Sequence, residues 1–392
     1  MALLGDYIRI KHGFAFKGDF IKTEDNGVVL VTPGNFEIGG GFKEKKCKFF
    51  SSDYPSDYVL HPGDLIVTMT DLSKQGDTLG YSALVPNSKR TYLHNQRIGL
   101  VDVFNPEADK GFIYWFMRTP RYQNTIVATS SGSTVKHTSP SRICEVEIDL
   151  PPLNEQKAIA DMLSSIEQKI QNNDRINDNL QQQALAIFQQ ELLRDGKLPE
   201  GWTNGSLLDI ANYLNGLAMQ KFRPTEGEIG LPVLKIKELR QGSCDASSEL
   251  CSLSIRPEYI IHDGDVIFSW SGSLLVDFWC GGTCGLNQHL FKVTSEKYPK
   301  WFYYAWTAHH LARFVAIAAD KATTMGHIKR EELAKATVVI PDAVSMERIG
   351  GLLQPLYDLI ISNRIENRKL AALRDTILPQ LMSGELDVSD LI

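Results

Sequence analysis

The stretch "QNNDRINDNL" at residues 171–180 decides how this chain is organised. It interrupts a helical apolar rhythm and puts Asn173 and Asn177 where aliphatic side chains are expected. The stretch "ISNRIENRKL" at residues 361–370 has asparagines at the same two positions. Polar residues at the contact positions of paired helices fix register and orientation at some cost in stability. The two stretches therefore predict two long helices that pair with each other.

The contact surface expected between these helices, here called the seam, follows steps of three and four residues. Its members are Ile159, Leu163, Ile166, Ile170, Asn173, Asn177 and Leu180 in the first helix, and Ile349, Leu353, Ile360, Asn363, Asn367 and Leu370 in the second. A helix of ~40 residues is roughly 60 Å long. Pro355 lies within the second helix and is expected either to kink it or to mark the start of its regular part.

The segments that precede the two helices are also repeated. "YVLHPGDLIVTMT" (58–70) matches "YIIHDGDVIFSWS" (259–271), and "HNQRIGLV" (94–101) matches "LNQHLFKV" (286–293). The chain therefore reads as a tandem duplication of one module, a globular domain followed by a long helix. The expected boundaries are 1–151 for the first domain, 152–195 for the first helix, 196–340 for the second domain, and 341–392 for the second helix and tail.

Short β-rich runs bounded by Gly, Pro and Asp predict strands in both domains, for example "DLIVTM" (64–69) and "DVIFSW" (265–270). Aromatic-rich helices are predicted over 110–127 and 299–319. Several short strands with one or two helices indicate an α+β domain. The expected fold is thus two α+β domains separated by a long antiparallel two-helix coiled coil, with internal pseudo-two-fold symmetry.

The charge distribution does not exclude a nucleic-acid partner, although the formal net charge is −6. Residues 1–151 hold 17 basic and 17 acidic side chains, and residues 196–340 hold 15 of each. The negative excess therefore belongs to the two helical segments. The globular domains are neutral on average and free to present a basic face.

The sequence indicates a protein of the cytoplasm. The N-terminal residues lack the basic and apolar regions of a signal peptide. No apolar run approaches the ~18 residues needed to span a bilayer. The six cysteines form no disulfide framework, which is typical of a reducing compartment.

No set of residues in the sequence carries a recognisable catalytic chemistry. The Gly-rich stretch "EIGGGFK" (37–43) lacks the GK[ST] of a phosphate-binding loop, and there is no G-x-S-x-G motif. Cys280 and Cys284 have a spacing compatible with zinc, but Cys244 and Cys251 are badly spaced and the first domain has no equivalent set. We therefore expect no catalytic residue, no metal site and no cofactor.

Three motifs together give the chain a family resemblance. They are "LPPLNEQKAIADMLSSIEQKIQNNDRIN" (150–177), "LPEGW" (198–202) at the start of the second domain, and "ILPQLMSGELDV" (377–388) near the end. With two globular domains, each followed by a long helix, the chain resembles the DNA-specificity (S) subunit of type I restriction–modification systems. The resemblance implies two target-recognition domains, each reading one half of a split DNA site, with the helices as a spacer. It also implies a non-catalytic subunit that binds two methyltransferase (M) subunits and, through the complex, restriction (R) subunits.

Candidate DNA contacts are polar residues in loops that occur at equivalent places in both copies. Four lysines share one loop, two N-Q motifs supply amides, and two further loops combine small residues with Lys and His. These candidates are Lys43, Lys45, Lys46, Lys48, Asn95, Gln96, Arg97, Ser133, Thr134, Lys136, His137, Asn287, Gln288, Lys321, Thr323, Thr324, His327 and Lys329.

Two other functions compete with DNA recognition. In the first, the coiled coil is a structural linker that joins two protein-binding domains without DNA contact, so reversing the charge of Lys136 and Lys329 would leave nucleic-acid affinity unchanged. In the second, the chain is itself a methyltransferase or nuclease and would bind S-adenosylmethionine or Mg²⁺.

Overall fold

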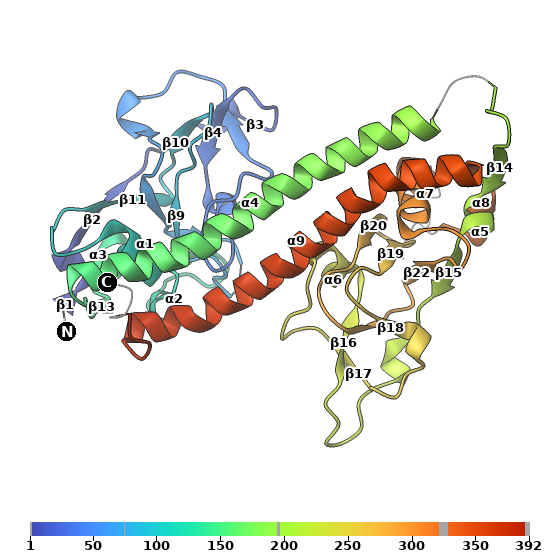
Figure 1. Cartoon of the computed structure of the whole chain (residues 1–392). Coiled ribbons are helices and arrows are strands. Elements are labelled where there is room, and N and C mark those ends of the chain that lie inside the picture. The colour runs from blue at the N-terminus through green and yellow to red at the C-terminus, as the bar shows by residue number, and fades with distance from the viewer. Residues whose placement is uncertain (1, 74, 194–196, 321–327, 389–392) are drawn as a thin grey trace. The chain divides into compact units, whose positions relative to one another are not determined.

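The computed structural model describes residues 2–73, 75–193, 197–320 and 328–388 (Figure 1). The chain forms two compact units. Unit 1 contains residues 1–167 and 372–392, and unit 2 contains residues 168–371. Each unit thus holds one globular domain and part of both long helices. Within the described ranges, no helix is long and apolar enough to cross a membrane.

The globular domain of unit 1 is built on two sheets, with strand orders β3-β5-β4-β10-β6 and β2-β11-β7-β9, and on the small pairs β1-β13 and β12-β8. Its strands are β1 (Ala2–Leu3), β2 (Ile8–His12), β3 (Ile21–Lys22), β4 (Val28–Val31), β5 (Lys48–Phe50), β6 (Val59–Leu60), β7 (Leu65–Thr68), β8 (Thr70–Asp71), β9 (Ser82–Leu84), β10 (Thr91–His94), β11 (Ile98–Val103), β12 (Lys136–His137) and β13 (Glu147–Ile148). Its helices are α1 (Lys110–Phe116), α2 (Pro120–Ala128) and α3 (Pro140–Cys144).

The globular domain of unit 2 has sheets with strand orders β15-β22-β19-β20 and β17-β16-β21-β18, and the pair β14-β23. Its strands are β14 (Thr203–Ser206), β15 (Asn212–Asn215), β16 (Leu231–Leu234), β17 (Leu250–Cys251), β18 (Ile260–Ile261), β19 (Val266–Ser269), β20 (Leu275–Phe278), β21 (Cys284–Leu286), β22 (Leu290–Thr294) and β23 (Thr337–Ile340). Its helices are α5 (Leu207–Ile210), α6 (Ile236–Gln241), α7 (Lys300–Asp320) and α8 (Arg330–Ala334).

The two domains share one topology. The order β2-β11-β7-β9 corresponds to β15-β22-β19-β20, and the parallel pair β4-β10 corresponds to β16-β21. The tandem duplication and the α+β class are therefore confirmed. The copies differ at the predicted helix over 110–127, which is divided into α1 and α2, whereas α7 is continuous. The division occurs because Pro120 has no N–H to donate, and the Thr119 side chain caps the new helix by accepting from the Tyr122 N–H.

The two long helices, α4 (Leu153–Leu192) and α9 (Ala343–Ser383), pair antiparallel within each unit. In unit 2, Glu191 near the end of α4 pairs with Arg348 near the start of α9. In unit 1, Arg374 of α9 pairs with Glu167 of α4. Gly384 follows the end of α9 with a left-handed φ of 73°, a conformation that commonly ends a helix. The helix begins well before Pro355 and continues through it, so its regular part does not start there.

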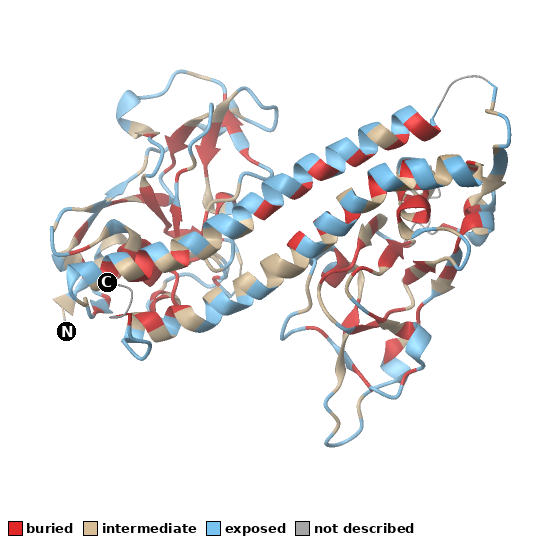
Figure 2. Ribbon diagram, in the orientation of Figure 1, coloured by how far each residue is buried: buried red, intermediate tan, exposed pale blue. Residues whose placement is uncertain are grey.

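About half of the residues of α4 are exposed, those of α9 are mostly exposed or half-buried, and the buried positions of both helices lie along one side (Figure 2). In unit 1 these positions join the core formed by α1, where Ile159 and Leu163 of α4 pack with Leu378 and Leu381 of α9. In unit 2 they join an aromatic core around α7. Each fully buried aliphatic or aromatic side chain stabilises the fold by roughly 1.5–3 kcal/mol. The helices are therefore held by the domains as well as by each other.

Candidate nucleic-acid interface

In the first copy, three segments that are distant in sequence meet at the end of β7. The Met69 N–H donates to the Arg97 carbonyl (2.9 Å), and the Thr138 N–H donates to the Met69 carbonyl (3.0 Å). Strand β12, which carries Lys136 and His137, pairs with β8. The His137 ring lies 3.1 Å from the Thr70 hydroxyl. The structure therefore brings together two of the predicted loops, at 95–97 and at 132–137.

The second copy repeats this arrangement at the end of β19. The Ile328 N–H donates to the Trp270 carbonyl at 3.0 Å, as Thr138 donates to Met69 in the first copy. The Ser271 hydroxyl lies 3.1 Å from Nδ1 of His289. Ile328 and the turn at 287–289 therefore both lie beside the end of β19. Lys329 is exposed just before α8, whereas Lys321, Thr323, Thr324 and His327 lie outside the described residues.

Asn95 and Asn287 face the protein in both copies. The Asn95 side chain accepts from the Arg97 N–H (3.1 Å), and Asn287 accepts from the His289 N–H (3.2 Å). Both asparagines are buried, with exposed fractions of 6% and 7%. A Cβ added to Gly13 would lie 2.1 Å from the Asn95 carbonyl oxygen, and glycine fits this close approach because it has none.

The neighbouring polar side chains reach solvent. Gln96 and Arg97 are exposed beside the inward-facing Asn95, and Gln288 is partly exposed beside Asn287. Ser133 and Thr134 are exposed at the tip of the hairpin that β12 closes. Each asparagine therefore fixes its turn, and the residues that follow it point away from the domain.

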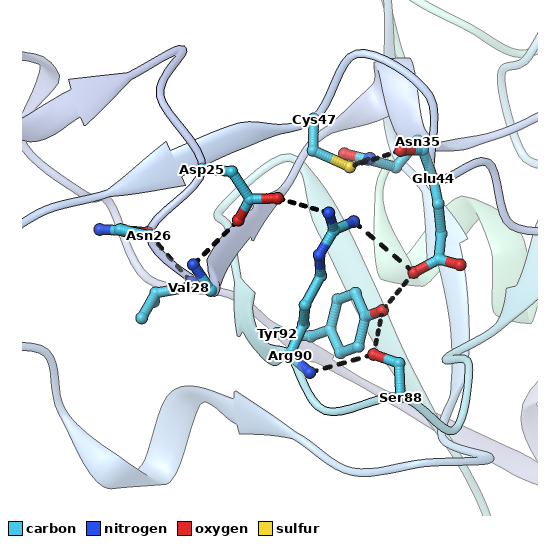
Figure 3. Close-up of polar contacts among 10 residues, drawn as sticks. Asp25, Asn26, Val28, Asn35, Glu44, Cys47, Ser88, Arg90 and Tyr92 are labelled. Carbon is cyan, nitrogen blue, oxygen red and sulfur yellow. Dashed lines mark hydrogen bonds and ion pairs between the residues drawn. The ribbon is translucent and has the colours of Figure 1, made fainter.

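The loop at residues 43–48 is anchored by a polar cluster (Figure 3). Its Glu44 carboxylate accepts from the Tyr92 hydroxyl at 2.6 Å and lies 3.9 Å from the Arg90 guanidinium. Arg90 also pairs with Asp25. Burial and the hydrogen bond to Glu44 raise the pKa of Tyr92 to about 12, which keeps its hydroxyl protonated as a donor. The Glu44 carboxylate is thus held by Tyr92 and Arg90 of the domain.

The lysines of the same loop point elsewhere. The Cys47 thiol donates to the Glu44 carbonyl at 3.1 Å and closes the turn. Within this turn Lys46 has a φ of 58°, in the left-handed region that non-glycine residues seldom adopt. Lys43 pairs with Glu37 at 3.4 Å. The side chains exposed to solvent are those of Lys45, Lys46 and Lys48.

A buried carboxylate, absent from the predicted candidates, organises the segment after β8. Asp71 accepts from the Ser73 N–H (2.6 Å) and from the Thr78 hydroxyl (2.7 Å). Burial alone would raise the pKa of Asp71, but these hydrogen bonds outweigh burial and the pKa is lowered. The Lys136 stem lies against this segment, since a Cβ on Gly76 would lie 3.7 Å from its Cγ. Leu72, which follows Asp71, is 66% exposed.

The seam asparagines lie between α4 and α9 in unit 2. The Asn363 amide donates to Asn177 at 2.9 Å. The Asn173 amide donates to Asn367 and to Glu366, both at 2.8 Å. Asn367 itself donates to the Ile170 carbonyl. These bonds pair each asparagine with the opposite helix.

The aliphatic seam positions differ in their surroundings. Leu180 of α4 and Ile349, Leu353 and Ile360 of α9 are buried in the core of unit 2, together with residues of α7. Ile159 and Leu163 are buried in the core of unit 1. Ile166, Ile170 and Leu370 are only partly buried. Many seam side chains therefore contact a globular domain as well as the opposite helix.

The cysteines are free thiols, and Cys280 belongs to a different core cluster from Cys251 and Cys284. Across the described part of the chain, no group of three or more His, Cys, Asp or Glu side chains could hold a metal ion. Burial raises the pKa of Cys280 to about 11, so its thiol stays protonated at neutral pH.

Arginines hold both domains to the long helices, and the sequence reasoning missed them. In unit 1, Arg118 stacks on Trp115 with the guanidinium 4.3 Å from the ring centre, and it lies 3.9 Å from Glu167. In unit 2, Arg364 and Arg368 of α9 reach carboxylates of the globular domain. The sequence shows only that the two equivalent positions of α4 carry aspartates, which does not identify the carboxylates that the arginines bind.

Curated relatives and solved structures of known proteins resemble this chain. It is 25% identical over 302 residues to the type I restriction enzyme MjaIX specificity subunit of Methanocaldococcus jannaschii, covering 71% of this chain and 70% of that one. It is 25% identical over 410 residues to the EcoKI specificity subunit of Escherichia coli K12, covering 93% and 83%. The fold resembles the crystal structure of a type I restriction–modification S subunit from M. genitalium, with a TM-score of 0.62, 15% identity and coverage of 99% and 96%.

A family model matches the chain twice. The model describes the type I restriction modification DNA specificity domain, and it matches residues 3–182 and again residues 199–373. Each match contains one globular domain and most of the long helix that follows it. Because the two matches cover most of the sequence and fall on the two copies of the duplication, the chain belongs to the family of type I restriction–modification DNA specificity domains.

Proposed function

We propose that this chain is the non-catalytic specificity subunit of a type I restriction–modification complex. In this proposal it reads a bipartite sequence in double-stranded DNA and acts in the cytoplasm. Its partners are M subunits, of which we expect two, and R subunits that join through the complex. Residues 1–151 and 196–340 act as the two target-recognition domains. Residues 152–195 and 341–392 supply the helices, and methyl transfer and cleavage belong to the partners.

The observation that carries the proposal is the repetition of one loop arrangement in two copies of a DNA-specificity domain. In each copy an N-Q turn lies beside the end of a central strand, at Met69 or at Trp270. A protein that reads a split site needs two such surfaces, one for each half. The repeated arrangement therefore favours a two-part target over a single contiguous one.

The exposed side chains suit two kinds of DNA contact. Gln96 and Gln288 can pair with adenine edges, and Arg97 can pair with guanine, because the major groove presents matching donors and acceptors there. Lys45 and Lys46 are suited to phosphate contacts, which position a protein without reading sequence. We assign base reading to the N-Q turns and the hairpin at 131–137, and phosphate contact to the lysine loop.

The proposal is tested by mapping methylated adenines in DNA from cells that carry this subunit together with its methyltransferase partner. The expected result is methylation at one bipartite motif, with two specified half-sites and an unread gap of constant length. Cells that carry the methyltransferase without this subunit are the control and should lack that motif. A contiguous motif, or methylation unchanged by the subunit, would refute the proposal.

A further inference from the structure

The second recognition domain is fastened to α9 by a two-point arginine contact. Arg368 donates to both carboxylate oxygens of Asp263, at 2.7 and 2.8 Å, and also to the Cys280 carbonyl. Asp263 in turn accepts from the Gly282 N–H at 2.8 Å. The pKa of Asp263 is lowered, chiefly by its hydrogen bond to Arg368. One guanidinium thus holds two separate turns of the domain, and a bidentate pair of this kind fixes direction as well as distance.

A second arginine, one helical turn earlier, extends the contact. Arg364 donates to Asp277 of β20 at 2.7 Å. The side chains of this pair are 26% and 28% exposed, so the pair is largely shielded from solvent. Apolar contacts lie beside it, since the Tyr357 ring of α9 lies 5.5 Å from Phe278. The ion pairs add directional bonds to an apolar contact that could otherwise slide or rotate.

The fastened turns lie at the opposite end of the strands from the candidate reading loops. Strand β19 runs from the turn containing Asp263 to Trp270, and β20 runs back from that loop to the turn containing Cys280. A strand of four residues spans about 13 Å. A rotation of about 15° at the fastened end would therefore move the reading loop by about 3.4 Å, which is the rise of one base pair.

The first copy lacks these arginines. Its helix α4 carries Asp174 and Asp178 at the positions equivalent to Arg364 and Arg368, and aspartates cannot form the same bonds with carboxylates. Asp174 instead accepts from Asn367 of the other helix. The arginine contact is therefore a feature of the second copy and not a general requirement of the repeated module.

We propose that Arg364 and Arg368 are positioning residues that hold the second recognition domain in one orientation on α9 and thereby restrict the DNA gap to one length. This inference rests on the proposed function and adds to it a determinant of gap length. Base identity within each half-site is set by the loops and is independent of these arginines.

The test uses the complete subunit with its methyltransferase partner and a duplex library. Both half-sites are held constant in the library, and the gap is shortened or lengthened by one or two base pairs. Arg368→Ala should raise methylation at altered gaps by about tenfold relative to the native gap, as expected for the loss of one charge-assisted contact. Arg368→Lys should give an intermediate value, because an ammonium cannot replace the bidentate pair. The half-site bases should remain those of the wild type.

Two further variants separate positioning from a loss of stability. Exchanging the charges, with Arg368→Asp and Asp263→Arg in one protein, should restore much of the gap discrimination that Arg368→Asp alone removes. Arg348→Ala is the matched control, because it removes a bidentate pair with Glu191 that joins the two helices instead of the domain and a helix. It should lower thermal stability without changing the accepted gap.

The outcomes are distinguishable. If folded Arg368→Ala protein keeps the wild-type gap discrimination, or relaxes the half-site bases instead, the inference is wrong. If Arg368→Ala fails to fold, the variant with Arg368→Asp and Asp263→Arg provides the test. If that variant folds but does not regain discrimination between gap lengths, the inference is overturned. If the wild-type complex methylates no bipartite site, the proposed function itself fails.

Discussion

The amide pair formed by Asn177 and Asn363 gives a quantitative test of the helix pairing. Both side chains are buried, with exposed fractions of 4% and 8%, and they share one hydrogen bond of 2.9 Å. Replacing either one with Leu leaves the other amide without this partner inside the seam. An unsatisfied buried polar group costs about 1–3 kcal/mol. Each single variant is therefore expected to lose about that much local stability, reduced somewhat by the added apolar contact.

The double variant, Asn177→Leu with Asn363→Leu, is expected to behave differently. It leaves neither amide of the pair unsatisfied and places two Leu side chains in contact, so its local stability should equal or exceed that of the wild type. The two substitutions should thus be coupled by about 2 kcal/mol or more in favour of the double variant. The cost appears in specificity, because a seam with fewer polar pairs tolerates more than one register.

Hydrogen–deuterium exchange is the suitable assay, because a chain with two compact units does not unfold in one two-state step. Amides in 171–180 and 361–370 report the free energy of local opening. Asn179→Leu is a control, since Asn179 is exposed on the same helix and accepts a hydrogen bond from Gln183 of that helix. It should change the opening free energy by less than about 0.5 kcal/mol. Additive effects of the two seam substitutions would refute the reasoning.

Three further predictions concern the domains. Gly216→Ala places a Cβ 2.2 Å from the Asn287 carbonyl oxygen. It should therefore lower the free energy of unfolding of the second domain by about 1–3 kcal/mol and weaken DNA binding. Hydrogen bonds, chiefly from Ser252, lower the pKa of Glu228 from 4.5 to about 2. Because the pKa of Glu228 is depressed in the folded protein, the stabilisation that this carboxylate provides is present above pH 4.5 and is lost as the pH falls towards 2. Hydrogen–deuterium exchange of the amides in 252–254 should therefore become faster over this pH range in the wild type but not in Glu228→Gln. Lys45→Ala with Lys46→Ala should lower DNA affinity equally for all sequences and reduce the slope of log affinity against log salt by about 2.

The features that could be predicted from the sequence depend on local pattern. The long helices could be predicted from apolar residues spaced three and four apart. The duplication could be predicted because similar sequence motifs recur in the same order. The division between α1 and α2 was also readable, since Thr119 followed by Pro120 is a helix-start signal. The aromatic periodicity across 110–127 nevertheless favoured a single helix. Pro at the first position of a new helix does not disturb the apolar spacing on either side, so the pattern does not show the break between α1 and α2.

The candidate site was harder to predict because orientation depends on tertiary neighbours. Asn95 and Gln96 are adjacent polar residues and look equivalent in sequence. In the folded domain the backbone of Gly13 packs against the Asn95 carbonyl, and the Asn95 side chain accepts from the Arg97 N–H, whereas Gln96 is exposed. The arginines that hold the domains illustrate the same limit, since Arg368 reads as one more charge on a solvated helix until the position of Asp263 is known.

The junction between domain and helix shows how the two copies diverged while keeping the same contact. In unit 1, Gly111 faces Ala160, where a Cβ added to the glycine would lie 2.9 Å from the alanine Cβ. In unit 2 the equivalent positions hold Trp301 and Gly350, and a Cβ on this glycine would lie 3.0 Å from the indole nitrogen. The large residue on the domain is matched by the loss of a methyl group on the helix. Trp301 adds far more volume than the helix gives up, so the missing methyl group only makes room where the indole approaches the helix backbone. The same contact between domain and helix is therefore made in each unit by a different pair of side chains, so the helix at this point needs glycine only where the domain presents an indole.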